Sequence, residues 1–108
     1  MTTESHKSPK VTIVTACYNR AATIRETIES VLAQDYEHVE YIIIDGASTD
    51  DTQRIVEEYA SRLAHFVSEP DHGMYEALNK GLRMATGEII GWVHSDDVLY
   101  DTHTLSAI

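Results

Sequence analysis

The sequence predicts an α/β fold in which helices cover both faces of a parallel β-sheet. Apolar, strand-like segments alternate with segments of helical periodicity from residue 11 onwards. This repeated order is typical of parallel strands joined by right-handed crossovers. The second strand-like segment ends in a near-continuous apolar run, which indicates that the sheet is buried on both faces.

The first half of the chain contains two strand and helix pairs. VTIVTA, at Val11–Ala16, is β-branched and apolar, so we expect the first strand there. The next segment, ATIRETIESVLAQ, has apolar residues at helical spacing, and VEYIIID at Val39–Asp45 predicts the second strand. A second helix is expected over Asp51–Ser61. Three residues before it could cap its N-terminus: Ser48, Thr49 or Asp50.

The second half repeats the pattern. AHFVSEP predicts a short third strand that is stopped by Pro70, and MYEALNKGLRMA predicts a third helix with Leu82 among its inward residues. Gly87 is expected to end that helix. EIIGWV predicts the fourth strand, and DTHTLSAI has the character of the first turn of a fourth helix.

Composition narrows the function classes. A length of 108 residues fits one small domain or a piece of a larger one. Eight basic against eighteen acidic residues argue against nucleic-acid or anionic-membrane binding. One cysteine, Cys17, allows no intrachain disulfide. The polar start and the lack of a long apolar run predict an intracellular chain without a transmembrane segment, with residues 1–10 as a flexible tail.

Polar segments follow each predicted strand: CYNR, DGASTDD, EPDHG and HSDD. Ligands of such sheets bind at the carboxyl ends of the strands, so we expect the site there. The adjacent carboxylates Asp96 and Asp97 suit a hard divalent cation such as magnesium or manganese. Neighbouring side chains in extended backbone point in opposite directions, so the two acids should have different roles. The alternative is a solvated loop in which Asp97 or Asp101 caps the last helix.

The same segments exclude several other classes of nucleotide-binding or phosphate-binding protein. ACYNRAAT contains no glycine, which excludes the Gly-x-Gly-x-x-Gly turn of dinucleotide-binding dehydrogenases. The P-loop pattern is absent as well. The turn after the first strand also lacks the acids that a receiver domain or a haloacid-dehalogenase-type phosphatase places there.

Four segments together resemble the N-terminal, nucleotide-binding half of a glycosyltransferase family 2 enzyme with the GT-A fold. They are VTIVTACYNR, IIIDGASTDDT, DHGMYEALNKGLRMATGE and GWVHSDDVLY. The resemblance implies a Rossmann-like sheet in the order 3-2-1-4. It also implies that residues 11–108 are the nucleotide-sugar-binding part of a truncated GT-A domain.

In activity, the resemblance implies an inverting, metal-dependent transfer of a sugar from a nucleotide-diphosphate sugar to an acceptor hydroxyl. Asp96 matches the second acid of the family's Asp-x-Asp motif, the usual ligand of Mn²⁺ or Mg²⁺. No residue can be assigned as general base, which is expected outside this chain, so the chain alone is expected to be inactive. A non-catalytic nucleotide-diphosphate-binding module is the alternative. A sugar-phosphate nucleotidyltransferase would need a Gly-rich loop that is missing.

The nucleotide-sugar contacts implied by the resemblance follow the strands or lie on the third helix. They are Thr15, Ala16, Tyr18, Arg20, Asp45, Asp71, Asn79, His94, Ser95 and Asp97. Base recognition is expected to depend on Asp45, Thr15 and Tyr18. Three of the contacts have another interpretation: Asp45 could be a turn-forming acid, Tyr18 an aromatic at the edge of the core, and Arg20 an exposed cation rather than a phosphate ligand.

The chain departs from the family pattern at four positions. His94 replaces the first acid of Asp-x-Asp and could ligate metal, contact ribose or simply pack. Ala16 replaces a frequent proline, and Leu78 replaces an arginine. Gly46 replaces the second acid of the family's Asp-Asp variant, although Asp-Gly is also familiar in the family.

Partners and location follow from the same resemblance. We expect a sugar or lipid-linked acceptor bound by a region outside this chain, and a role in polysaccharide biosynthesis. The expected location is the cytoplasm, peripheral to the inner membrane face in the full-length protein. Without further strands the fourth strand is a sheet edge, so we expect either a homodimer through Ile89–Val93 or a marginally stable monomer.

Overall fold

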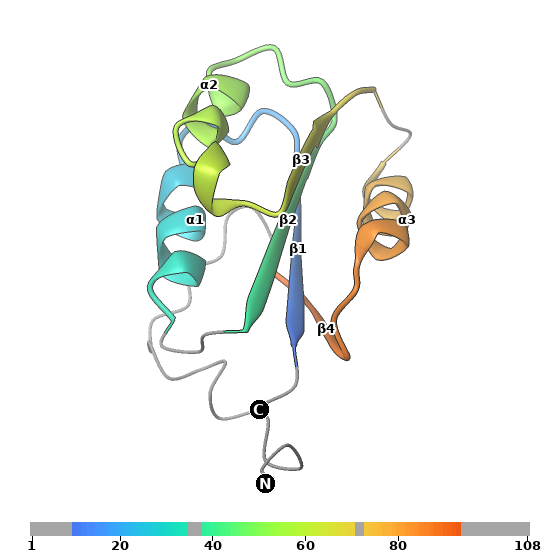
Figure 1. The fold of residues 1–108 in the computed structure, drawn as a ribbon. Helices are drawn as coiled ribbons and strands as arrows, with labels where there is room; N and C mark the ends of the chain where they lie inside the picture. The colour runs from blue at the N-terminus through green and yellow to red at the C-terminus, as the bar shows by residue number, and fades with distance from the viewer. Residues whose placement is uncertain (1–9, 35–37, 71–72, 94–108) are drawn as a thin grey trace, which may run out of the picture.

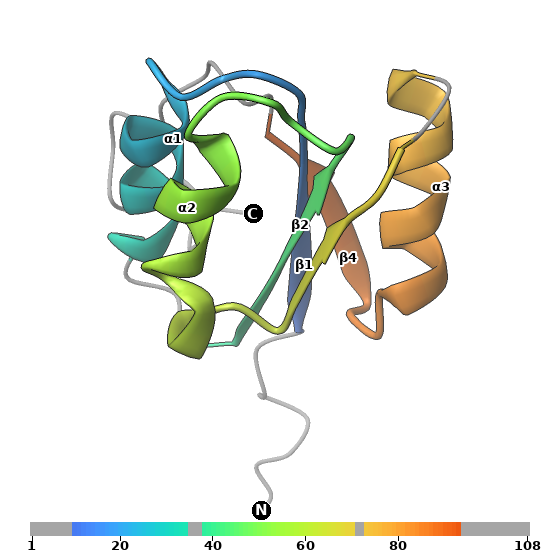
Figure 2. The ribbon, with the colours of Figure 1, turned by 90° about the horizontal axis from the view of Figure 1, so that it is seen from above.

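The predicted α/β architecture is confirmed by a computed structural model, which describes residues 10–34, 38–70 and 73–93. Along the chain the elements are β1 (Val11–Cys17), α1 (Ile24–Leu32), β2 (Val39–Asp45), α2 (Thr52–Glu57), the 3₁₀-helix η2 (Ala60–Arg62), β3 (His65–Ser68), α3 (Met74–Met84) and β4 (Ile89–Trp92). The four strands form one parallel sheet in the predicted order β3-β2-β1-β4. Helices α1 and α2 cover one face and α3 covers the other (Figures 1 and 2).

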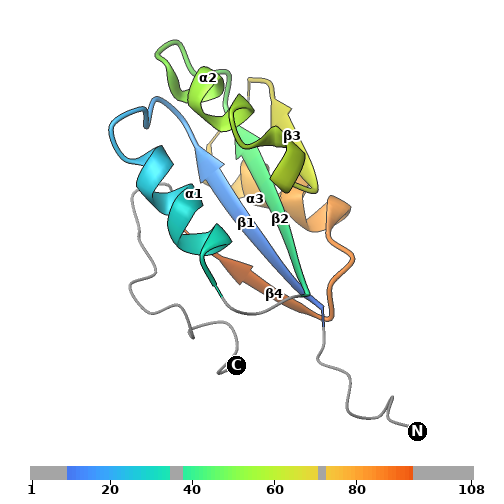
Figure 3. The ribbon, with the colours of Figure 1, turned by 60° about the vertical axis from the view of Figure 1, so that its left-hand side comes forward.

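Strand β1 lies at the centre of the sheet, as Figure 3 shows from the side of α1 and α2. It pairs with β2 along its whole length, from Val11 opposite Val39 to Cys17 opposite Asp45. β1 and β2 therefore end level with each other, and the loops that follow them start side by side. β4 pairs only with the first part of β1, as far as Val14 opposite Trp92.

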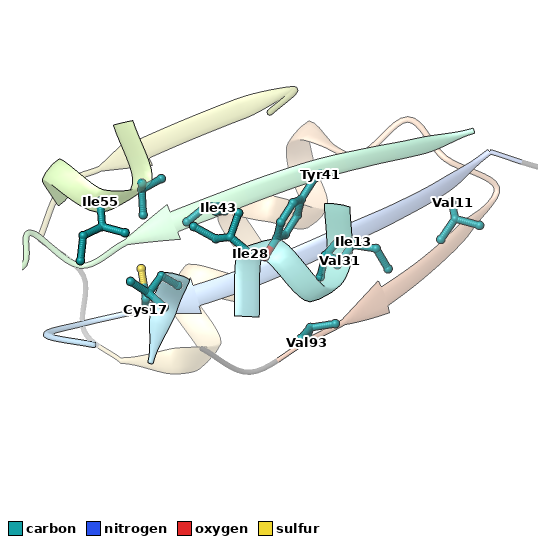
Figure 4. Packing of buried hydrophobic residues seen from close by; sticks show 11 residues of the cluster. Val11, Ile13, Cys17, Ile28, Val31, Tyr41, Ile43, Ile55 and Val93 are labelled. Carbon is teal, nitrogen blue, oxygen red and sulfur yellow. The ribbon is translucent and has the colours of Figure 1, made fainter. Parts of the chain in front are cut away.

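The larger core lies between the sheet and the two helices α1 and α2 (Figure 4). Alternate residues of β1 and β2, including Ile13 and Ile43, point toward these helices because successive side chains of a strand face opposite ways. They meet the apolar face of α1, where Ile28 is fully buried. The helical periodicity of the sequence and the strand alternation thus produce one continuous apolar layer.

The smaller core lies under α3 and contains Val14, Ile42, Ile44 and Ala77. Gly81 allows α3 to approach β1, because a Cβ atom there would lie 2.5 Å from Cγ1 of Val14. Leu82 was expected to point inward but is 39% exposed. It follows Gly81, which is buried against the sheet, and consecutive residues are rotated by about 100° around a helix.

Two predicted helix boundaries are wrong. The second helix does not run to Ser61: α2 ends at Glu57, and its last turn tightens because the N–H groups of Glu58 and Tyr59 donate to Ile55 and Val56, three residues back. Its N-cap position is Asp51, whose side chain makes no capping bond. Of the three predicted residues, Asp50 accepts the N–H of Thr52, the first residue of α2, at 2.9 Å.

Gly87 does not end the third helix, which stops at Met84 with Ala85 as its C-cap. Gly87 instead lies against β1, where a Cβ atom would be 2.5 Å from Oγ1 of Thr12. No helix within the described residues is long and apolar enough to cross a membrane. The expected tail, apart from Lys10, and the expected last helix (residues 101–108) fall outside the described residues.

β4 forms one edge of the described sheet, and Ile90 on this strand is 47% exposed. Association of two copies through this edge stays a prediction, which light scattering at increasing concentration would test.

Candidate functional site

Two loops meet at the carboxyl end of the sheet. The first loop (residues 18–23) follows β1, and the second loop (residues 46–51) follows β2. The backbone N–H of Gly46 donates to the carbonyl of Cys17 at 2.9 Å, so the β1–β2 pairing continues into the loops. This is the edge where ligands bind in parallel α/β sheets.

Three successive backbone N–H groups of the first loop, those of Asn19, Arg20 and Ala21, donate to side chains that follow β2. The acceptors are Ser48 Oγ at 2.8 Å, Thr52 Oγ1 at 2.8 Å and Asp50 Oδ2 at 3.2 Å. In many doubly wound folds the N–H groups of this first turn bind phosphate. Here these three N–H groups are already hydrogen-bonded within the protein, so the turn is not a phosphate-binding turn. Its lack of glycine agrees with this.

The Asn19 side chain, in the first loop, accepts hydrogen bonds from the backbone of the second loop. Its Oδ1 accepts the N–H groups of Thr49 at 2.8 Å and Asp50 at 3.3 Å. Asn19 has a φ of 53° and Ala47 a φ of 64°, both in the left-handed region. Asparagine tolerates this conformation, but for alanine it is strained, and such strain is concentrated at functional sites.

Asp45 is fully buried at the end of β2. Its carboxylate accepts the backbone N–H of Ser48 at 2.8 Å, the hydroxyl of Ser48, the hydroxyl of Ser68 at 2.8 Å and the thiol of Cys17 at 3.4 Å. Asp45 therefore joins β1, the second loop and the end of β3. This matches the interpretation of Asp45 as a turn-forming acid, and its contact with a base or ribose stays a prediction.

The remaining predicted residues fall into different environments. Thr15 is fully buried, with its hydroxyl 2.9 Å from that of Tyr41, and Ala16 is half-buried. Tyr18 is 56% exposed, so its ring is accessible for stacking on a base. Arg20 is also exposed in the first loop, whereas Asn79 is exposed on α3, across the sheet from α1 and α2. Five predicted residues lie outside the described residues: Asp71, His94, Ser95, Asp96 and Asp97.

Lys80 on α3 is a residue that the sequence analysis did not single out. Its side chain is only 12% exposed and forms an ion pair with Glu69 at 3.0 Å. Lys80 also donates to the carbonyl of Pro70 at 3.4 Å. It thus ties α3 to the chain that leaves β3 at the same edge of the sheet.

The roles of Ser48 and Thr52 in joining the loops were missed as well. Short polar side chains after a strand suggest hydrogen bonds to nearby backbone. Their partners, however, are in the first loop, 29 and 32 residues away along the chain.

The described part of the chain contains no group of three or more His, Cys, Asp or Glu side chains that could hold a metal ion. β4 runs parallel to β1 toward the carboxyl-end edge, and the N–H of Val93 donates to the carbonyl of Val14 at 3.1 Å. The sequence directly beyond it supplies the carboxylates Asp96 and Asp97, whose oxygen donors fit a hard cation.

The fold and the two loops together define an α/β domain with a candidate ligand site at the carboxyl end of a parallel sheet. The family model described as Glycosyl transferase family 2 matches residues 12–107, and the chain belongs to this family. An uncharacterized glycosyltransferase of Rickettsia typhi is 38% identical over 93 residues, which are 86% of this chain and 29% of that protein. Another, of Mycobacterium tuberculosis, is 36% identical over 91 residues, 83% of this chain and 35% of its own length. The chain thus spans about a third of these relatives.

Solved structures show the same fold. The mannosyltransferase PcManGT from Pyrobaculum calidifontis, in complex with GDP-Man and Mn²⁺, matches 94% of this chain and 31% of its own, with 35% identity and a TM-score of 0.86. TarS from S. aureus, in complex with UDP-GlcNAc, matches 82% of this chain and 27% of its own, with 31% identity and a TM-score of 0.76. The chain therefore has the GT-A fold that the sequence predicted.

Proposed function

We propose that this chain is the donor-binding part of an enzyme that transfers a sugar from a nucleotide-diphosphate sugar to an acceptor hydroxyl. The observation that carries the proposal is the hydrogen bonding between the two loops at the carboxyl ends of β1 and β2. Tyr18, in the first of these loops, is exposed. Family membership supports it, as do the GDP-Man and UDP-GlcNAc complexes of similar proteins.

The loop geometry favours the nucleoside rather than the diphosphate at this position. The N–H groups of Asn19, Arg20 and Ala21 are occupied, whereas the Tyr18 ring is accessible. A diphosphate must then be neutralised elsewhere, and a net charge of −10 makes a cation more necessary.

We assign the diphosphate to the segment after β4, with Asp96 as the protein ligand of Mn²⁺ or Mg²⁺ and Asp97 in another role. A bound cation would supply Lewis-acid stabilisation of the departing nucleoside diphosphate. The transfer is inverting in this proposal, because the acceptor hydroxyl attacks the donor carbon directly. In this proposal the general base and the residues that bind the sugar or lipid-linked acceptor lie outside this chain, which spans about a third of its relatives. The enzyme would act in polysaccharide biosynthesis, in the cytoplasm or at the inner face of the membrane.

The alternative function is a non-catalytic module that binds nucleoside diphosphates, which the same loops would support. Metal-dependent sugar transfer by the full-length protein would decide for the enzyme. Sugar transfer by the 108-residue chain alone would contradict the placement of the base outside it.

Calorimetric titration tests the binding step. UDP and GDP are each titrated into the chain with MnCl₂ and again with EDTA. We expect one of the two to bind, and to bind more tightly with manganese. Asp96→Ala should abolish the manganese-dependent part, while Asp97→Ala should retain more of it. Equal affinity in manganese and in EDTA would contradict the metal assignment, and no binding of either nucleotide would contradict the proposed function.

A further inference from the structure

The hydrogen bonds between the two loops form a continuous network, which we call the loop network. It consists of the side chains of Asn19, Ser48, Asp50 and Thr52 together with the backbone N–H groups that they accept. We propose that the loop network is a pre-formed support for the nucleotide, in which Thr52 and Asn19 are positioning residues that act through the first loop. This inference rests on the proposed function and assigns a task to residues that need not contact the ligand.

Thr52 is the first residue of α2 and is fully buried. Its hydroxyl accepts the backbone N–H of Arg20 at 2.8 Å and donates to Oδ1 of Asp50. The other oxygen of Asp50 accepts the N–H of Ala21 at 3.2 Å. The buried hydroxyl therefore holds the peptide group of Arg20 directly, and through its bond to Asp50 it orients the exposed carboxylate that accepts the N–H of Ala21.

Tyr18 is fixed on both sides by this arrangement. The carbonyl of Cys17 before it accepts the N–H of Gly46, and the N–H of Asn19 after it donates to Ser48 Oγ at 2.8 Å. The backbone of Tyr18 is thus held while its side chain is 56% exposed. An aromatic group that is already in place loses less conformational entropy on binding, which raises affinity without any new contact.

The other end of the sheet offers a matched control. Thr12 in β1 is also fully buried, and its hydroxyl also accepts a backbone N–H, that of Gly87 at 2.9 Å. This hydroxyl likewise donates to a carboxylate, Glu40 Oε1, at 2.8 Å. Thr12→Val and Thr52→Val therefore remove the same chemistry from the two ends of the same sheet.

The experiment compares the unmodified 108-residue chain with these two variants. Thermal unfolding is followed for each, and UDP and GDP are titrated in the presence of MnCl₂. Removing either hydroxyl leaves a peptide N–H without its acceptor, so both variants should lose thermal stability to a similar extent. Thr52→Val should weaken nucleotide binding by about tenfold, and Thr12→Val by less than about twofold.

The outcomes separate this inference from the proposed function. If the unmodified chain binds neither nucleotide, the proposed function fails and this inference fails with it. If the chain binds a nucleotide but Thr12→Val and Thr52→Val retain equal affinity, only the positioning role is overturned. A loss confined to Thr52→Val supports it, because a purely structural role would affect both variants alike.

A second variant keeps the test decisive if Thr52→Val does not fold. Asn19→Gly retains the left-handed backbone without strain but removes the oxygen that accepts the N–H groups of Thr49 and Asp50. It should also weaken binding by about tenfold, and unchanged affinity would overturn the inference.

Hydrogen exchange in the ligand-free chain adds an independent measurement. The amides of Asn19, Arg20 and Ala21 should exchange slowly, and exchange at the rate of an open peptide would show that the network is not pre-formed.

Discussion

The two ends of the sheet are held by similar chemistry but present different surfaces. Each end contains a carboxylate from β2 with low exposure, Glu40 at the amino end and Asp45 at the carboxyl end, and each accepts several hydrogen bonds. At the carboxyl end the bonded loops contain two left-handed residues and leave Tyr18 exposed. The amino end joins strands, whereas the carboxyl end presents the loops to which we assign the nucleotide.

The amino-end contacts fix the turn that precedes β4. Oε1 of Glu40 accepts the hydroxyl of Thr12 at 2.8 Å and the N–H of Thr86 at 2.9 Å, and Oε2 accepts the Thr86 hydroxyl at 2.9 Å. Lys10 lies 3.5 Å from the same carboxylate. These contacts of Glu40 with Thr12, Thr86 and Lys10, which we call the amino-end clamp, fix the position at which β4 begins. The loop network fixes the two loops at the opposite edge of the sheet. Substitutions at the two ends should therefore separate stability from binding.

The largest effect is expected for Asp45→Ala, which should lower both stability and affinity. The substitution removes the acceptor of four hydrogen bonds and leaves the N–H of Ser48 without a partner. We expect a loss of about 3 kcal/mol in the free energy of unfolding and about tenfold weaker nucleotide binding. Urea unfolding and calorimetry measure the two. Asp45→Asn, which keeps the shape and one acceptor oxygen, should cost less; an equal loss would show that one oxygen cannot replace the carboxylate. Unchanged stability of Asp45→Ala would contradict a stabilising role of these hydrogen bonds.

Gly87→Ala should lower stability alone. The new Cβ would lie 2.5 Å from Thr12 Oγ1 and 2.8 Å from the Thr12 backbone nitrogen, so the backbone must shift. We expect a loss of about 2 kcal/mol in the free energy of unfolding. Gly91→Ala is the control, because a Cβ there meets only Cδ1 of Ile13, at 3.1 Å. A large loss of nucleotide affinity in Gly87→Ala would contradict the separation of the two ends.

Glu40 in the amino-end clamp should also make the free energy of unfolding depend on pH. Burial acts to raise the pKa of Glu40, but hydrogen bonds from Thr86 and Thr12 outweigh it and lower this pKa from 4.5 to about 2. Because the folded-state pKa is the lower one, the contribution to stability is complete above about pH 4.5 and is lost as the pH falls toward 2.

Thermal unfolding between pH 2 and pH 6 measures this dependence. Glu40→Gln should flatten the curve in the acid window, while the same substitution at Glu26, exposed on α1, should leave its slope unchanged. A parallel shift of the whole curve in Glu40→Gln would contradict the assignment.

The smallest effect is expected for Ala47→Gly in the second loop. Relief of the left-handed strain at a φ of 64° outweighs the larger entropy of an unfolded glycine, so stability should rise by about 0.5 kcal/mol. Ala33→Gly is the control, because Ala33 has an ordinary φ of −82° and should lose stability on substitution. Urea unfolding of both variants checks the prediction, and a loss of stability in Ala47→Gly would mean that residue 47 is not strained.

Much of the fold could be predicted because periodicity is a local property. VEYIIID predicted Val39–Asp45, and the structure has β2 over the same residues. The boundaries of α2 could not be predicted in the same way, because its last turn tightens into 3₁₀ geometry that the apolar pattern does not encode. The strand order came from the resemblance to the family and is confirmed.

The candidate site was predicted only as a set of segments. Position after a strand correctly brought Tyr18 and Asp45 to one edge of the sheet. It did not distinguish the exposed tyrosine from the buried acid, and it missed the burial of Lys80 against Glu69. Exposure depends on what packs over a residue, and that partner can come from anywhere in the chain.

By itself the sequence determined the α/β class, the family and the edge of the sheet that carries the polar segments, since these follow from local pattern and from motif order. Only the tertiary structure decided that the first loop has its N–H groups occupied and that Asp45 lies beneath the surface. The physical reason is the distance along the chain. Asn19 and Ser48 are 29 residues apart, and Glu40 and Thr86 are 46 apart, so these hydrogen bonds exist only once β1, β2 and β4 lie side by side.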